Sequence, residues 1–226
     1  RLNSKIISNT LLNQLLEECE FYNKKESITF FEITTAAAFL AFSRIKSDIL
    51  MLETGLGGRF DATNVIPETL CTIITPISMD HMSFLGNKIE SIASEKIGIF
   101  KNKTPAIISP QTDKVLKIVK KKAEKMGIDL FAYKNNWDIS NVTENQFYYI
   151  LNGKKQKILS PRLYGHHQYH NAGAAITASK IQKKFKLSDE LISQGVNKAI
   201  WPARMQNINS GKLKNLIDEN FDIWLD

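Results

Sequence analysis

The residues Asp48-Ile-Leu-Met-Leu-Glu53, followed by Thr54-Gly-Leu-Gly-Gly58, form a short apolar run that ends in a carboxylate and a glycine-rich turn. The run is too short for a helix. An uninterrupted apolar run of this length is typical of a strand buried on both faces of a parallel sheet. We therefore predict a buried strand over 48–53, with Glu53 at its carboxyl end.

Strands and helices alternate along the rest of the chain. The patterns predict strands at 71–75, 106–109 and 129–132, and helices at 10–20, 29–42, 89–100, 114–125, 171–185 and 189–199. This alternation predicts an α/β fold with a doubly wound, mostly parallel sheet. The stretch 146–159 departs from the pattern, because Asn152-Gly153 between two β-rich runs predicts a hairpin. Residues after Trp201 are expected to begin a different module.

Composition excludes several classes of protein. Hydrophobic residues make up 43% and charged residues 23% of the 226 residues, which is typical of a globular chain and excludes general disorder. No apolar run approaches the ~20 residues that span a bilayer, so no membrane partner is expected. Cys19 and Cys71 are too few for a disulfide framework, and they suit the reducing cytoplasm. The chain begins at Arg1 without a signal-peptide pattern, and both ends are interpreted as cuts through a longer polypeptide.

The net charge of +7 gives an isoelectric point near 9.3. A positive net charge is compatible with binding to nucleic acid, to an anionic membrane surface or to an anionic small molecule. The densest lysine run, 114–125, follows a helical pattern and predicts a solvated helix face. Since no RRM, zinc-finger or Arg-rich signature accompanies it, nucleic acid is not expected as a partner.

Two predicted strands bring ionisable residues to one sheet edge, Glu53 after the first and Asp80-His81 after the second. Ligands bind beyond the carboxyl ends of strands in open α/β sheets. A carboxylate and an imidazole there could hold Mg²⁺; the alternative is a capping carboxylate and a surface histidine. The glycine-rich turn is no phosphate loop, because it lacks the Gly-Lys-Ser/Thr ending. Arg59 could bind an anion, although pairing with Asp61 is favoured.

Two later segments are dense in polar side chains. Tyr164-Gly-His-His-Gln-Tyr-His-Asn171 holds three of the four histidines, and His166 and His170 have the i, i+4 spacing of helical metal ligands. No glutamate lies between them as in a metalloprotease helix, so polar groups facing a nucleotide are favoured over zinc, Asn171 among them. In Trp201-Pro-Ala-Arg204, proline stiffens the entry to an arginine, which is more often a surface ion pair than a ligand.

Taken together, six segments resemble the dihydrofolate synthase/folylpolyglutamate synthase family of the Mur ligase superfamily. They are Thr29–Glu32, Leu52–Asn64, Met79–Gly86, Glu95–Gly98, His167–Asn171 and Trp201–Arg204. The Leu-Glu-x-Gly-Leu-Gly-Gly-Arg-x-Asp-Ala-Thr-Asn string is specific to the folate branch. The resemblance implies an ATP-dependent ligase that adds L-glutamate to dihydropteroate, or to the glutamyl tail of a reduced folate, through an acyl phosphate.

The resemblance also implies roles for single residues. Glu53, His81 and Lys96 would serve two Mg²⁺ sites, Lys96 after carbamylation by CO₂. Asn171, Arg204 and Asp226 would bind ATP, with Arg204 near the phosphates and Asp226 at the ribose. Thr29, Phe31 and Asp61 would hold the pterin. From its own surroundings in the sequence, Lys96 would be a helix-surface lysine.

The resemblance implies an ATP-binding central domain over 1–203 and the start of a glutamate ligase domain over 204–226. The family's phosphate loop and most of its C-terminal domain are absent from these residues, so the isolated chain is predicted to be inactive. The resemblance also implies a monomer. Ala203 replaces the usual glycine before Arg204, which matters if that position needs a positive φ. Thr54 replaces a more usual valine. The alternatives are a non-catalytic remnant and another Mur-type amino-acid ligase.

Overall fold

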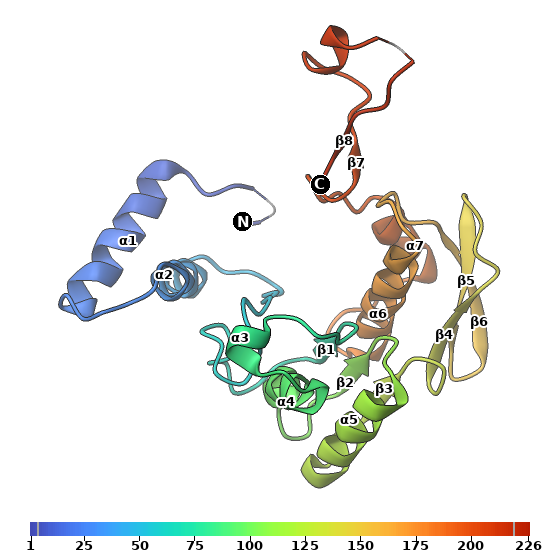
Figure 1. Cartoon of the computed structure of the whole chain (residues 1–226), viewed down its shortest axis with the longest axis horizontal. Helices are drawn as coiled ribbons and strands as arrows, with labels where there is room; N and C mark the ends of the chain where they lie inside the picture. Colours follow the sequence, from blue (N-terminus) through green and yellow to red (C-terminus); the bar gives the residue numbers. More distant parts are fainter. Residues whose placement is uncertain (4, 219) are drawn as a thin grey trace. The chain divides into compact units, whose positions relative to one another are not determined.

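The computed structural model describes residues 1–3, 5–218 and 220–226, and the chain forms two compact units. Unit 1 comprises residues 1–67 and 79–99, and unit 2 comprises residues 68–78 and 100–226. In the described residues, unit 1 has helices only, while unit 2 combines parallel and antiparallel sheets with helices (Figure 1). The predicted α/β class is thereby confirmed.

Unit 1 is built on two helices that lie side by side. Its helices are α1 (Asn9–Asn23), α2 (Phe30–Arg44), the short α3 (Met82–Leu85), α4 (Ile89–Lys96) and the 3₁₀ turn η1 (Ile97–Ile99). Leu15 of α1 packs against Ala37 and Ala41 of α2, and the small alanine side chains let the helices approach closely. Both predicted N-terminal helices are confirmed, and α3 is an element that the sequence patterns missed.

The N-terminus of α2 is a capping box. The Thr29 hydroxyl accepts a hydrogen bond from the Glu32 N–H at 3.2 Å, and the Glu32 carboxylate accepts one from the Thr29 N–H at 2.9 Å. Two N–H groups that a helix start leaves unpaired are thus satisfied reciprocally. The predicted start of this helix is correct.

The predicted strand over 48–53 is wrong. The segment pairs with no other strand, and its four apolar residues are exposed, Met51 to 88%. A strand needs a neighbour for its backbone N–H and C=O groups. The described residues of unit 1 contain no strand, so the apolar run has no ladder to join within its own unit.

Unit 2 contains a three-stranded parallel sheet in the order β1-β2-β3. The strands are β1 (Thr72–Ile74), β2 (Ala106–Ile108) and β3 (Leu130–Ala132), with Thr72 opposite Ala106 and Ala106 opposite Leu130. All three strands were predicted from the sequence, and each prediction was slightly longer than the observed strand. Helix α5 (Asp113–Met126) connects β2 to β3 and buries Val115, Val119 and Ala123, while its lysines stay on the solvated face as predicted.

An antiparallel sheet follows, in the order β4-β5-β6. Its strands are β4 (Trp137–Ser140), β5 (Gln146–Leu151) and β6 (Lys154–Leu159). Asn152 and Gly153 join β5 to β6 with φ values of +47° and +79°, the conformation for which an Asn-Gly pair is selected in two-residue hairpins. The predicted hairpin is confirmed, and β4 extends it to three strands.

The core of unit 2 lies between these sheets and α6 (His167–Ile181). Trp137 packs so closely on Gly173 that a methyl there would lie 2.4 Å from the indole ring. Tyr149 is buried, and burial raises its pKa to about 12. The Thr177 hydroxyl donates to the Gly173 carbonyl at 2.8 Å, so its single proton is used there. Tyr149 is therefore the donor in its own 2.8 Å contact with Thr177.

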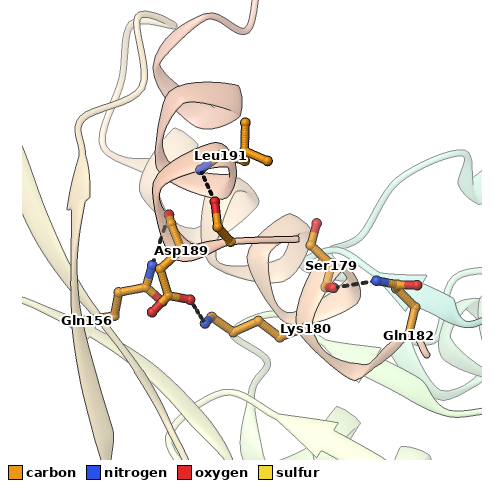
Figure 2. A network of polar contacts seen from close by, with 7 residues as sticks. Gln156, Ser179, Lys180, Gln182, Asp189 and Leu191 are labelled. Atoms are coloured by element: carbon orange, nitrogen blue, oxygen red, sulfur yellow. Dashed lines mark hydrogen bonds and ion pairs between the residues drawn. The ribbon is translucent and has the colours of Figure 1, made fainter. Parts of the chain in front are cut away.

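Polar contacts fix the connection from α6 to α7 (Asp189–Asn197), as Figure 2 shows. The Lys180 ammonium lies 2.7 Å from the Asp189 carboxylate, and the Gln156 amide donates to the Asp189 carbonyl at 3.2 Å. Helix α6 was predicted over 171–185 but begins and ends four residues earlier. The side chain of Gln182 accepts a hydrogen bond from the Phe185 N–H at 2.7 Å and so holds the turn that follows the helix.

The last part of unit 2 is a two-stranded ribbon of β7 (Gln206–Asn207) and β8 (Trp224–Leu225), with the 3₁₀ turn η2 (Lys214–Leu216) between them. The ring of Tyr164, just before α6, lies 4.8 Å from that of Trp224. This contact places the ribbon beside the start of α6. Among the helices in the described part of the chain, none is long and apolar enough to cross a membrane.

Candidate functional site

Residues 53–64, here called the glycine loop, fold around the carboxylate of Asp61. One Asp61 oxygen accepts from the N–H groups of Gly55 at 2.8 Å and Leu56 at 2.9 Å. The other accepts from the Thr63 N–H at 2.9 Å and the Thr63 hydroxyl at 2.5 Å. Asp61 is buried, and every lone-pair site of its carboxylate is used inside the loop. The carboxylate therefore holds the loop closed.

These bonds decide the ionisation of Asp61. Burial on its own would raise the pKa of the carboxyl group. The hydrogen bonds from Thr63, Leu56 and Gly55 favour the charged form more strongly, so the pKa of Asp61 lies below its ordinary value. Asp61 is thus a carboxylate that the fold keeps ionised.

Two glycines of the loop have close neighbours. A methyl on Gly55 would lie 2.4 Å from the ring of Phe31, the α2 residue expected at the pterin. A methyl on Gly58 would lie 2.8 Å from the Lys96 carbonyl oxygen, at the last residue of α4. At Gly58 the neighbour is backbone, so only a glycine permits this approach, whereas at Gly55 the exposed Phe31 ring could turn away from a larger residue. The loop therefore lies directly between Phe31 and the turn that carries Lys96.

Arg59 fastens the loop to the end of α4. Its N–H donates to the Glu95 carbonyl at 2.9 Å, and its guanidinium donates to the Ser94 carbonyl at 3.2 Å and lies 3.6 Å from the Glu95 carboxylate. The favoured pairing of Arg59 with Asp61 is wrong, because Asp61 is already saturated by the loop. The side-chain amide of Asn64 adds hydrogen bonds to the carbonyls of Arg59 at 3.0 Å and Gly98 at 3.4 Å.

His81 has a left-handed backbone, with φ of +49°, immediately before α3. The Asp80 carboxylate accepts from the His81 N–H at 2.8 Å and lies 3.4 Å from its Nε2. A left-handed backbone is uncommon outside glycine, although histidine is among the residues that tolerate it. Residues held in such conformations gather at functional sites, which makes His81 a stronger candidate than its sequence position alone did.

The donor chemistry of Glu53 suits Mg²⁺, and both Glu53 and His81 are accessible. Lys96 is half-buried at the end of α4 and would supply an oxygen ligand only once carbamylated. Within residues 1–3, 5–218 and 220–226, no group of three or more His, Cys, Asp or Glu side chains is placed to hold a metal ion. The residues fit magnesium in type, but they form only part of a coordination sphere.

Thr29 and Phe31 lie at the start of α2, and both residues are exposed. The Thr29 hydroxyl donates to the Glu32 carboxylate at 2.6 Å as part of the capping box. The Phe31 ring packs on Gly55 and keeps 41% of the residue exposed. An exposed aromatic face held by a rigid loop is suited to stacking against a flat ring.

The residues expected at the nucleotide all lie in unit 2. The Asn171 amide, in the second turn of α6, donates to the Gln168 side chain at 3.1 Å. Asp226 accepts a hydrogen bond from the Met205 N–H at 3.1 Å, which brings its carboxylate beside Arg204. The structure therefore ties Asp226 to the turn that carries Arg204, through the backbone of Met205.

The turn that carries Arg204 is strained on both sides. Ala203 has φ of +54° and Met205 has φ of +45°. The Ala203 N–H donates to the Gln206 side chain at 3.1 Å, which helps to hold this conformation. The departure from glycine noted in the sequence thus falls at a position with positive φ, where alanine costs about 1–2 kcal/mol.

Residues 5–179 match the family model described as the Mur ligase middle domain. The chain belongs to the Mur ligase family. The match includes the glycine loop and most of α6, whereas Arg204 and Asp226 lie beyond it.

Several members of the Mur ligase family are similar over most of this chain. The dihydrofolate synthase/folylpolyglutamate synthase of Bacillus subtilis is 36% identical over 226 residues, which cover 96% of this chain and 50% of that protein. The structure of E. coli FolC in complex with ADP has a TM-score of 0.84 and 27% identity, and the match covers 100% of this chain and 51% of that chain. A second FolC structure, with DHPP and ADP, has a TM-score of 0.81 and 28% identity over 92% of this chain and 49% of that chain. The chain thus spans about half the length of the Mur ligases it matches.

The histidine-rich segment gives no zinc site in this Mur ligase chain. The rings of His166 and His170 lie 5.7 Å apart, and His170 packs edge-on against Tyr133 at 5.0 Å. Burial lowers the pKa of His170, and the neighbouring His166 lowers it further. In the described residues, no third ligand joins the two imidazoles.

Sequence reasoning missed two residues of this Mur ligase site. Asn64 and Gly98 stand at the ends of strings that carried the resemblance, yet neither was given a role. Their signal was their place in the Leu52–Asn64 and Glu95–Gly98 strings, which carried the resemblance. The contact itself joins distant parts of the sequence, so local patterns do not reveal it.

Proposed function

We propose that this chain is the central part of an ATP-dependent ligase that joins L-glutamate to dihydropteroate, or to the γ-glutamyl tail of a reduced folate. The observation that carries the proposal is the glycine loop. Its sequence is the string that carries the resemblance to the folate branch, and the loop packs against Phe31 on one side and the end of α4 on the other. The names of the similar proteins support the same substrates.

The reaction needs an acyl phosphate, formed when ATP phosphorylates the acceptor carboxylate before the glutamate amine attacks it. Such chemistry depends chiefly on positioning and charge neutralisation. In the proposal, Glu53, His81 and carbamylated Lys96 hold Mg²⁺, which would neutralise phosphate charge when bound. Phe31 offers a stacking face for the pterin, with Thr29 at its edge. Asp61, whose oxygens are all used within the loop, would act by holding the loop in shape.

Unit 2 contributes the nucleotide residues in this proposal. The ADP complexes of E. coli FolC support a nucleotide as ligand. In the proposal, Asn171 presents its amide from α6, Arg204 binds the phosphates, and Asp226, which is held at the Arg204 turn by the Met205 N–H, binds the ribose. We further propose that residues 1–203 belong to the central ATP-binding domain and 204–226 to the glutamate ligase domain, and that the protein is a cytoplasmic monomer without nucleic-acid or membrane partners.

A chimera tests the proposal. Residues 1–226 replace the matching half of the B. subtilis relative, and ATP-dependent transfer of labelled L-glutamate to dihydropteroate is measured. Transfer is expected in the chimera, and it should be lost in its Glu53→Gln and Lys96→Ala variants. The isolated chain should transfer none, because its 226 residues contain no Gly-Lys-Ser/Thr phosphate loop.

The alternative is a non-catalytic remnant of such a ligase. The chain carries the complete set of Glu53, His81, Lys96, Asn171 and Arg204, which speaks against a remnant, since random drift would have removed some of these residues. A folded chimera that binds ADP but transfers no glutamate would favour the remnant. Transfer to a UDP-sugar peptide in place of dihydropteroate would favour another Mur-type ligase.

A further inference from the structure

Asn64 joins two segments that are remote in the sequence. Its side-chain nitrogen lies 3.0 Å from the carbonyl oxygen of Arg59, in the glycine loop, and 3.4 Å from that of Gly98, in η1. Both neighbours are acceptors, so only the NH₂ end of the amide can face them. Asn64 itself is half-buried, which limits the water available to replace these bonds.

The other contacts between the loop and the end of α4 are of three kinds. The exposed Arg59 guanidinium donates a hydrogen bond to the Ser94 carbonyl at 3.2 Å, where water competes with it. Backbone meets backbone where the Arg59 N–H donates to the Glu95 carbonyl and where Gly58 and Gly98 allow close approach. The ion pair of Arg59 with Glu95 is wide and partly exposed, and pairs of this kind contribute little. Asn64 is therefore the side chain best placed to hold the two segments in one relative position.

We propose that Asn64 is a positioning residue, which fixes the loop carrying Glu53 against the helix end carrying Lys96. Its importance for catalysis rests on the proposed function. The two segments would supply ligands to one magnesium cluster, so their separation must be kept to a fraction of an ångström. A misplacement of about 1 Å in a catalytic assembly can cost about 100-fold in rate.

The amide is chemically specific at this position. In Asn64→Asp, a carboxylate of the same shape would face two carbonyl oxygens and repel both. Asn64→Ala removes both bonds without adding charge and serves as a second variant. Asn87→Asp, at an exposed position of the same unit, makes the same charge change as a matched control.

The first test uses the 226-residue chain and needs no ligase activity. Hydrogen exchange of the Arg59 amide is measured together with the rate at which acetic anhydride acylates Lys96 relative to Lys88. In both Asn64 variants, the Arg59 amide should exchange about ten-fold faster, as loss of about 1.4 kcal/mol implies. The relative acylation of Lys96 should change at least about two-fold, while amides of α1 and the Asn87→Asp chain stay unchanged.

Two outcomes of this test would overturn the proposal. Unchanged Arg59 exchange and Lys96 acylation in both variants would show that Asn64 positions nothing. Exchange in α1 accelerated as much as in the loop, in both variants, would assign Asn64 to general stability instead.

The chimera separates this inference from the proposed function. In it, Asn64→Asp should lower kcat at least about ten-fold and leave KM for ATP within about two-fold, as expected for a residue that acts on the reacting centre. An unchanged kcat would overturn the positioning role while the ligase assignment stands. A chimera that never transfers glutamate would refute the ligase assignment, and the exchange and acylation results would still decide whether Asn64 positions Lys96.

Discussion

Gly98 packs directly against Arg59, because a methyl added to Gly98 would lie 2.4 Å from the Arg59 Cβ. Carbon atoms do not approach one another this closely, so the glycine loop meets the helix end backbone to backbone. The Glu95-Lys-Ile-Gly98 string therefore ends in glycine for a reason of packing. Lys96 lies only two residues before Gly98, so the same contact also holds Lys96 close to the loop.

Replacement of Gly98 by alanine should lower the free energy of unfolding by about 1–3 kcal/mol, the usual cost of overpacking. Urea unfolding followed by circular dichroism measures the change. Gly195 in α7 is the control, because nothing lies within 4 Å of the methyl it would gain. Gly195→Ala should raise the free energy of unfolding by about 0.5–1 kcal/mol. A Gly98→Ala chain as stable as the unmodified one would contradict the close contact.

Asp61→Asn should destabilise the glycine loop by about 1–3 kcal/mol at neutral pH, because its amide NH₂ would face N–H donors. The pKa of Asp61 is lowered in the folded chain, so its stabilisation is fully present above an unfolded pKa of about 4. That stabilisation is lost as the pH falls through the lower folded pKa. The free energy of unfolding is measured at several pH values between 2 and 7. It should fall less steeply with falling pH in Asp61→Asn than in the unmodified chain. An equally steep fall in both chains would argue against the hydrogen-bonded carboxylate.

His170 should make the chain less stable in mild acid. Burial and the neighbouring His166 lower its pKa, and Lys134 acts in the same direction, while Asp138 opposes them. The unfolded chain then binds a proton more readily, so stability falls as the pH drops below about 6.5 towards the folded pKa, and no further below it. His170→Phe keeps an aromatic edge for Tyr133 and should remove this dependence. In an NMR titration, His166→Asn should raise the pKa of His170.

The Arg204 turn should respond to substitution of Ala203. Ala203→Val should lower the free energy of unfolding by about 1–2 kcal/mol, because a β-branched residue tolerates φ of +54° poorly. Ala203→Gly relieves strain, and the greater freedom of glycine in the unfolded chain offsets part of the gain. Its net effect should be a stabilisation below about 1 kcal/mol. Equal stability of the valine and glycine variants, measured by thermal unfolding, would show that the turn is not strained.

Local signals in the sequence predicted the elements whose determinants are local. Thr29 and Glu32 form the predicted capping box, and Asn152-Gly153 forms the predicted hairpin turn. The prediction of a strand over 48–53 was wrong because a strand also needs a neighbouring strand to pair with. An apolar run in the sequence does not indicate whether such a neighbour exists. The sequence likewise predicted an ion pair between Arg59 and Asp61 from proximity alone, whereas Asp61 is used by nearer backbone N–H groups.

The candidate site was predictable only in part. The resemblance selected Lys96, whose surroundings in the sequence are those of an ordinary helix lysine. The contact of Gly58 with the Lys96 carbonyl depends on two segments meeting in space, and no local pattern encodes it. The role of Asn64 is hidden for the same reason, since its amide reaches the backbone carbonyls of Arg59 and Gly98.

The unpaired segment at Ile49–Leu52 bears on how this chain must be handled. An exposed apolar run without a strand partner is a template for intermolecular β-aggregation, and charges at its two ends act as gatekeepers against it. Asp48 and Glu53 are those charges. A Glu53→Gln chain would lose a gatekeeper together with a candidate ligand. Its colloidal state therefore has to be checked, by light scattering, before any loss of metal binding or activity is assigned to the missing carboxylate.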